Sequence, residues 1–91
     1  MTYIFPTDPA AITLISGNQT VNESDVVDPI CLAKGMPTPF PASWTRVSDN
    51  SSVFFPLVIT GKHDEGGYKC TAKNGIGNPA SQVFYIIVES E

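Results

Sequence analysis

The chain has 91 residues, which is the size of a single small domain, and a chain this short buries only a limited fraction of its surface. Nine acidic residues against five basic ones give a net charge of −4, with no run of Lys and Arg. Nucleic acid is therefore not expected as a partner, because phosphate binding needs clustered positive charge. No apolar stretch approaches the roughly 18 residues of a membrane span, so no direct membrane insertion is expected.

Short apolar blocks separated by Pro, Gly, Asn and Ser clusters indicate strands rather than helices. The first strand is expected at residues 12–15, after Pro6 and Pro9, and the second at residues 26–33. Pro29 lies inside the second range, and proline cannot donate to a strand ladder. This strand is therefore expected to start late or to bulge at Pro29.

Two further strands are expected in the middle of the chain, at residues 42–47 and 57–60. Only twelve residues separate Trp44 from Leu57, and they are rich in turn-forming side chains. This interval leaves little room for additional strands, so the sheet is expected to be reduced near residues 48–56.

The last two strands are expected at residues 67–73 and 82–88. Successive side chains of a strand point to opposite faces. In the first of these strands Tyr68, Cys70 and Ala72 therefore share one face, and the side chains between them point to water.

One cluster resembles a chemical site, namely His63-Asp64-Glu65. A general acid–base pair needs side chains that converge on a pocket, whereas adjacent side chains on a turn are expected to point apart. Calcium suits carboxylates on a turn, but the chain has no loop with several carboxylates at the required spacing. We expect a solvated turn here, with no catalytic residue, no metal and no cofactor, so the chain is not expected to be an enzyme.

Three motifs follow one another along the chain. They are Cys31-x-x-x-Gly35-x-Pro37-x-Pro39 with Trp44 thirteen residues after the cysteine, then Leu57-x-Ile59, and then Asp64-x-Gly66-x-Tyr68-x-Cys70-x-Ala72-x-Asn74-x-x-Gly77. In this order they resemble the immunoglobulin superfamily, and within it the I-set domains of cell-adhesion proteins and receptor ectodomains. The resemblance covers about residues 9–89, so residues 1–91 are expected to form a single immunoglobulin-like domain with its core in 9–89.

The resemblance implies an all-β fold, a two-sheet antiparallel immunoglobulin sandwich of about seven strands with a shortened C′/D region. It implies a buried disulfide between Cys31 and Cys70 beside Trp44. A redox or metal role for the cysteines lacks further ligands, because the chain has two Cys and one His. The resemblance also implies that the Tyr68 hydroxyl bonds to backbone near Asp64.

The closing strand, Val83 to Val88, is apolar at both parities, although the core needs only one. The family's closing strand suggests that Phe84, Ile86 and Val88 point inward. The side chains of opposite parity form an expected row of interface residues, with cover by a neighbouring loop such as the N-terminal segment 3–5 as the alternative. This row consists of Val83, Tyr85 and Ile87.

Phe40 is a further interface candidate, because it is expected at the exposed tip of the loop between the Cys31 and Trp44 strands. The segment Pro37-Thr38-Pro39-Phe40-Pro41 also allows a second interpretation, a polyproline ligand for an SH3-type groove. The resemblance favours the loop.

Three Asn-x-Ser/Thr sequons occur in expected turns, where a glycan would be tolerated. These glycosylation candidates are Asn18, Asn22 and Asn50. Together with the paired cysteines, they favour the secretory pathway.

The expected function is that of an extracellular protein-binding module of a cell-adhesion, receptor or matrix protein. Its expected partners are other proteins, either neighbouring immunoglobulin domains or a homophilic partner. The expected location is extracellular or at the cell surface, within a longer chain that carries the targeting signals. The alternative is an intracellular structural I-set module of a sarcomeric or cytoskeletal protein.

Overall fold

The computed structural model describes residues 7–40 and 42–89. The helical part of this region is one short 3-10 turn, η1 (Lys62–Asp64), and the regular structure is otherwise all strand. The strands are β1 (Asp8–Ile15), β2 (Gln19–Asn22), β3 (Val26–Val27), β4 (Cys31–Met36), β5 (Ser43–Arg46), β6 (Ser52–Val53), β7 (Leu57–Val58), β8 (Gly66–Ala72) and β9 (Ala80–Glu89).

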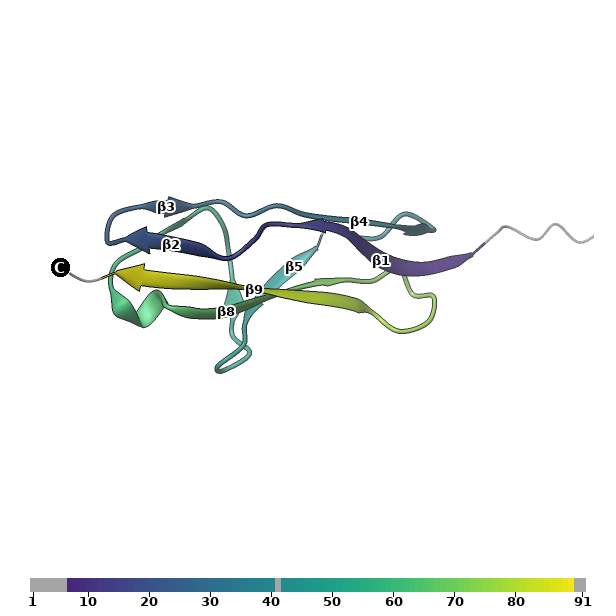
Figure 1. Ribbon diagram of the computed structural model, residues 1–91. Coiled ribbons are helices and arrows are strands. Elements are labelled where there is room, and N and C mark those ends of the chain that lie inside the picture. The colour runs from purple at the N-terminus through teal and green to yellow at the C-terminus, as the bar shows by residue number, and fades with distance from the viewer. Residues whose placement is uncertain (1–6, 41, 90–91) are drawn as a thin grey trace, which may run out of the picture.

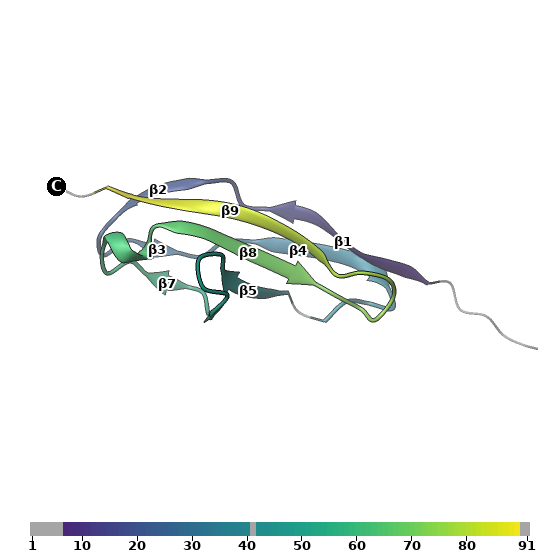
Figure 2. The ribbon, with the colours of Figure 1, turned by 90° about the horizontal axis from the view of Figure 1, so that it is seen from below.

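The strands form two layers, as Figures 1 and 2 show. One layer is a five-stranded sheet in the order β2-β9-β8-β5-β6. The other layer is made of two small sheets, β1-β4 and β3-β7. β1 begins at one end of the sandwich and β9 ends at the other (Figure 1). The predicted all-β sandwich is confirmed.

β2 is a strand that the sequence analysis does not anticipate. It runs parallel to β9, with Thr20 opposite Ile87 and Val21 opposite Val88. Of its four side chains only Val21 is buried. A single apolar residue between polar ones produces no periodic signal, so the strand forms through its backbone pairing with β9.

The second layer is interrupted at Pro29, which confirms the expected irregularity. β3 ends at Val27 and β4 begins at Cys31, and residues 28–30 belong to neither strand. The backbone at the break bonds instead to the end of β1: Ile30 N donates to Ser16 Oγ at 2.7 Å, and Ser16 N donates to Ile30 O at 2.9 Å. The proline therefore divides this layer into two separate sheets.

The interval after Trp44 is also reduced as predicted. β6, which takes the place of strand C′, has two residues and pairs with β5. β7 has two residues and pairs with β3. Between these two strands the structure, whose description is continuous here, contains no further strand that could serve as strand D.

The core lies between the layers and follows the predicted parities. Phe84, Ile86 and Val88 of β9 are almost fully buried, and so are Tyr68 and Cys70 of β8. The full buried cluster is Val21, Val27, Ile59, Tyr68, Phe84, Ile86 and Val88.

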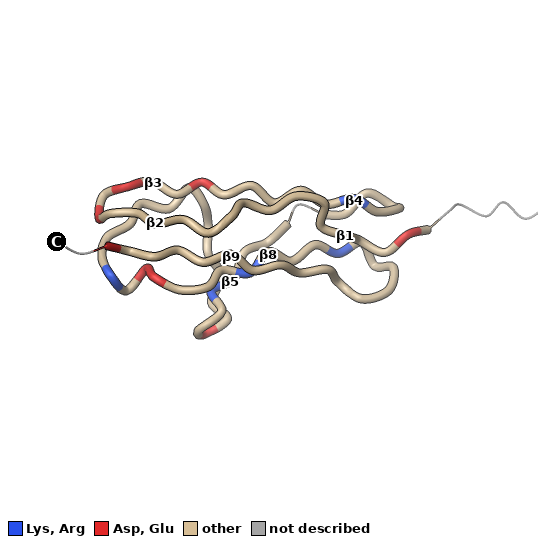
Figure 3. Tube along the Cα trace, viewed as in Figure 1, with Lys and Arg blue, Asp and Glu red and all other residues tan. Residues whose placement is uncertain are grey.

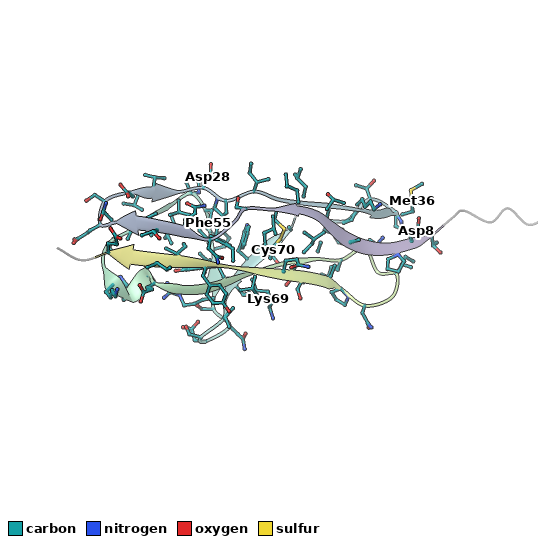
Figure 4. All side chains as sticks on the ribbon, viewed as in Figure 1. Asp8, Asp28, Met36, Phe55, Lys69 and Cys70 are labelled. Carbon is teal, nitrogen blue, oxygen red and sulfur yellow. A yellow bond between two sulfur atoms is a disulfide. The ribbon has the colours of Figure 1, made fainter. Side chains whose placement is uncertain are left out.

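The expected disulfide joins Cys31 and Cys70, with 6.6 Å between their Cα atoms. It lies between the two layers (Figure 4). Cys70 is buried, whereas Cys31 is only half-buried. Trp44 is the direct partner of Cys70 in the β5–β8 register, and its ring packs edge-on against Phe55 and Phe84 at 5.2 and 5.3 Å between centroids.

Candidate interface on the five-stranded sheet

The outward row of β9 is exposed to solvent. Val83, Tyr85 and Ile87 are 39%, 52% and 47% exposed, whereas the residues that follow each of them, Phe84, Ile86 and Val88, are buried. The alternative cover, segment 3–5, lies outside the described residues. The described part of the chain therefore leaves three adjacent apolar side chains uncovered on one face.

The row continues across the sheet, over Gly67 of β8, to Val47 just after β5. Tyr85 pairs with Gly67 of β8, and Val47 N donates to Gly67 O at 3.0 Å. A Cβ added at Gly67 would lie 3.1 Å from Tyr85 Cε1 and 3.2 Å from Val47 Cγ2. The Tyr85 ring and the Val47 side chain thus meet over the glycine. We call Val47, Val83, Tyr85 and Ile87 the outer patch.

Polar residues border the outer patch on both sides. On β8, Lys69 lies opposite Val83 and points away from the core (Figure 4). On β2, Thr20 lies opposite Ile87. Asn18 reaches across from the loop before β2, where its Oδ1 accepts a hydrogen bond from Tyr85 N at 2.9 Å. An apolar centre with a polar rim is the usual anatomy of a protein interface.

Phe40 does not join the outer patch. It is 67% exposed in the loop between β4 and β5, and its N–H donates to Lys73 O just beyond the end of β8. The outer patch is centred on Gly67, at the start of the same strand. The intervening residues span about 20 Å at the usual rise of a strand, so the structure separates the two predicted interface features.

Phe54 is an exposed aromatic residue that sequence reasoning missed. It is 85% exposed and lies beside an open cleft of about 430 Å³, which includes Pro29, Trp44 and Phe55. The cleft lies on the side of the sandwich where strand D is lacking. The sequence signal was available, since Phe54 is one of two consecutive aromatics and only one of them, Phe55, can enter the core.

The His63-Asp64-Glu65 turn differs from the expectation, because Asp64 is buried at 5% exposure. Its Oδ2 accepts hydrogen bonds from Thr60 N at 2.8 Å and Thr60 Oγ1 at 3.2 Å. Its Oδ1 lies 3.5 Å from Arg46 Nη2. The 3-10 turn rotates the carboxylate inward, so the expectation of a solvated turn is wrong for this residue.

Arg46 also organises the residues around Asp64. Its Nη1 donates to His63 O at 2.8 Å, and its guanidinium lies 5.5 Å from the centre of the Tyr68 ring. The Tyr68 hydroxyl donates to Asp64 O at 2.6 Å, which confirms the expected corner. Sequence reasoning gave Arg46 no role, although it shares the inward parity of Trp44 and is partly buried, where a cation is stabilised by an anionic partner.

Asp64 and Tyr68 have shifted pKa values. Burial would raise the pKa of the Asp64 carboxyl, but the Thr60 hydrogen bonds and the charges of His63 and Arg46 outweigh burial, so the pKa lies below its usual value. Burial raises the pKa of the Tyr68 hydroxyl. Asp64 is therefore ionised and Tyr68 neutral at physiological pH, which suits the hydrogen bonds they make.

The cluster does not have the geometry of a catalytic triad. Thr60 Oγ1 and Asp64 Oδ2 both approach the same imidazole nitrogen, His63 Nε2, at 2.8 and 3.7 Å. A triad requires the hydroxyl and the carboxylate on different ring nitrogens. Nor do the residues that the structure describes include a group of three His, Cys, Asp or Glu side chains suited to holding a metal ion.

The three sequons lie on exposed residues in different settings. Asn18 is in the loop between β1 and β2, and Asn22 is both the last residue of β2 and the first of the turn that follows, where Asp25 N donates to Asn22 O at 3.1 Å. Asn50 follows the turn after β5 and has a positive φ of 60°. All three sequon asparagines therefore lie in loops or turns between strands, or at the start of one.

Basic residues are spread along the length of the molecule (Figure 3). Within the described ranges, the structure contains no helix that is long and apolar enough to cross a membrane.

Comparison with known proteins gave sequence relatives and structural neighbours. No protein-family model matches the chain. Neural cell adhesion molecule L1 of Homo sapiens is 30% identical over 98 residues, and that of Rattus norvegicus is 29% identical. Each alignment covers 96% of this chain but 7% of the relative, so the chain spans a small part of the length of these proteins.

Solved structures share the fold at lower sequence identity. The chain superposes on part of a structure of the eight N-terminal Ig domains of DSCAM with a TM-score of 0.81 at 23% identity, covering 98% of this chain and 13% of that one. A complex of Dpr11 IG1 bound to DIP-gamma gives 0.79 at 22% identity, covering 92% and 49%. A chimeric titin Z1Z2 gives 0.77 at 20% identity, covering 96% and 100%.

Proposed function

Because this chain is a domain of the immunoglobulin superfamily, we propose that it is an extracellular protein-binding module of a cell-adhesion, receptor or matrix protein. The outer patch carries the proposal. Its apolar side chains are exposed on a regular sheet face. They do not pack in the core, and no described segment covers them. Apolar residues gathered in this way mark contact surfaces more often than isolated ones do.

The physical properties of the patch suit a protein partner. Burial of apolar area stabilises a complex by about 25 cal/mol per Å² before the costs of association are subtracted. Tyr85 is the central anchor, since tyrosine is enriched among residues that dominate binding energy. The partner class that we propose is another immunoglobulin domain, in line with the similar structure in which Dpr11 IG1 is bound to DIP-gamma.

The test compares two charge substitutions at similarly exposed apolar residues. Tyr85→Glu places a charge in the outer patch, and Val58→Glu places one on the opposite layer, where Val58 is 54% exposed. The domain, prepared without N-linked glycans, is coupled to beads, which are mixed with one another and with beads carrying other immunoglobulin ectodomains. Wild type and Val58→Glu are expected to aggregate, whereas Tyr85→Glu is expected to lose aggregation without a lower melting temperature. Binding that survives Tyr85→Glu would contradict the role of the patch.

The alternative, an intracellular structural module, is supported by the similarity to titin Z1Z2. The two functions differ in the redox state of the cysteine pair, because cytosolic thiols stay reduced.

A further inference from the structure

The outer patch has a neighbouring strand that carries a sequon. β2 lies beside β9 in parallel register, with Thr20 opposite Ile87. Val21 is buried, so alternation turns Thr20 outward onto the same face as the outer patch, and both Thr20 and Asn18 are exposed. The first and third residues of the sequon Asn18-Gln19-Thr20 therefore flank the apolar row.

The Asn18 side chain is fixed in position beside the outer patch. Its Oδ1 accepts a hydrogen bond from Tyr85 N at 2.9 Å, which continues the β2–β9 pairing by one more residue. This bond orients the amide next to Tyr85 and occupies the oxygen. The Nδ2 atom, to which N-linked sugars attach, is on the same exposed amide.

We propose that Asn18 carries an N-linked glycan that lies over the outer patch and limits access to Tyr85. Transfer forms a bond between Asn18 Nδ2 and the anomeric carbon of the sugar. It breaks the bond between that carbon and the phosphate of a lipid diphosphate sugar donor, and the amide proton leaves with the lipid diphosphate. The inference rests on the proposed extracellular setting, because this transfer takes place in the secretory pathway.

The other two sequons are placed less well to cover the patch. Asn22 pairs with Glu89, four residues beyond Tyr85 on β9, which is about 13 Å at the usual rise of a strand. Asn50 lies on the turn between β5 and β6, and β6 is at the opposite edge of the sheet from β2. Of the three asparagine side chains, that of Asn18 alone is hydrogen-bonded to a residue of the outer patch in the described structure.

The test removes the sequon without removing Asn18. Thr20→Ala abolishes the acceptor motif and leaves the Asn18–Tyr85 hydrogen bond in place, whereas Thr20→Ser keeps the motif as the matched control. The full chain is secreted from a eukaryotic host, and occupancy at each sequon is read by peptide mass spectrometry. Hydroxyl-radical labelling then reports the accessibility of the Tyr85 side chain. Wild type and Thr20→Ser are expected to carry the Asn18 glycan, and Tyr85 labelling is expected to rise on its loss in Thr20→Ala.

The outcomes separate this inference from the function on which it rests. Glycans on Asn22 or Asn50 with none on Asn18 would overturn the inference and leave the extracellular setting intact. A glycan on Asn18 with equal Tyr85 labelling in wild type and Thr20→Ala would overturn the covering role. A secreted chain with no glycan on any sequon would also overturn the inference, whereas failure of the chain to enter the secretory pathway would contradict both.

Discussion

Tyr68 connects the core to the turn before β8. Its ring is fully buried, and its hydroxyl donates to Asp64 O. The position follows from alternation with Cys70 along one strand, so a local pattern located it correctly. The bond also satisfies the Asp64 carbonyl, because a buried carbonyl without a hydrogen-bond partner destabilises the fold.

Tyr68→Phe is expected to lower the free energy of unfolding by about 0.5–1.5 kcal/mol, the usual net value of one hydrogen bond. The ring and its contacts remain, so the hydrogen bond to Asp64 O is the main change. Chemical denaturation followed by Trp44 fluorescence measures the difference. Tyr85→Phe serves as the control, since Tyr85 is half exposed and no hydroxyl bond is described for it. Equal midpoints for wild type and Tyr68→Phe would contradict the role of this bond.

Asp64 makes stability depend on pH. Its pKa is lower in the folded protein than the value of about 4 expected in the unfolded chain. A lowered folded pKa gives a stabilisation that is complete above the unfolded pKa and is lost as pH falls through the folded one. Asp64→Asn removes this contribution. The difference in unfolding free energy between wild type and Asp64→Asn is therefore expected to be largest above about pH 4 and to shrink at lower pH.

Denaturant titrations of both proteins between neutral and strongly acidic pH provide the measurement. Asp49 and Glu65 also have lowered pKa values, but they are present in both proteins and cancel in the difference. A difference that stays constant with pH would show that the Asp64 charge does not stabilise the fold.

At the level of elements, Asn74 ties the first strand to the loop after β4. Its Nδ2 donates to Asp8 O at 2.7 Å and to Pro37 O at 2.9 Å, and its Oδ1 accepts from Ile76 N at 3.1 Å. Asn74 lies two residues beyond the end of β8 and is buried. The sequence placed it in a motif, but its two distant partners are known only from the fold.

Gly35 on β4 leaves the space that Asn74 needs. A Cβ at this position would lie 2.7 Å from Asn74 Nδ2 and 3.2 Å from Ala10 Cα. Gly35→Ala is therefore expected to lower the free energy of unfolding by about 1–3 kcal/mol through crowding. Gly17→Ala is the control, because nothing lies within 4 Å of its added Cβ. Thermal melting of both variants checks this, and equal melting temperatures would show that Asn74 moves aside freely.

On the scale of the whole molecule, the disulfide joins the two layers where strand pairing is interrupted. It connects β4 to β8 over 39 residues of sequence. Closing a loop of this length reduces the entropy of the unfolded chain and stabilises the fold by about 4 kcal/mol in the chain-entropy model. The bond therefore provides a sizeable part of the stability of a domain of this size.

Replacing both cysteines by alanine is expected to lower the free energy of unfolding by about 2–5 kcal/mol. Chemical denaturation of the double variant measures the loss. A thiol assay on denatured, non-reduced native protein is the companion measurement, with no free thiol expected for an extracellular module. Two free thiols in native material would favour the intracellular alternative, and an unchanged unfolding energy would show that the two layers hold together without the bond.

The sequence by itself determined the features that depend on local alternation. The inward faces of β8 and β9, the exposed row of Val83, Tyr85 and Ile87, and the break at Pro29 all follow from side-chain parity or from the missing proline donor. Side-chain alternation repeats every second residue and a missing donor belongs to a single residue, so a short segment is sufficient to recognise these features.

Only the tertiary structure decided which distant residues meet. β2 becomes a strand because β9 supplies its backbone partner, and Asp64 is buried because Arg46 and Thr60 surround its carboxylate. Asn18 reaches Tyr85 across 67 residues of sequence. Such contacts depend on strand order and register, which are set by packing of the whole chain rather than by the period of any one segment.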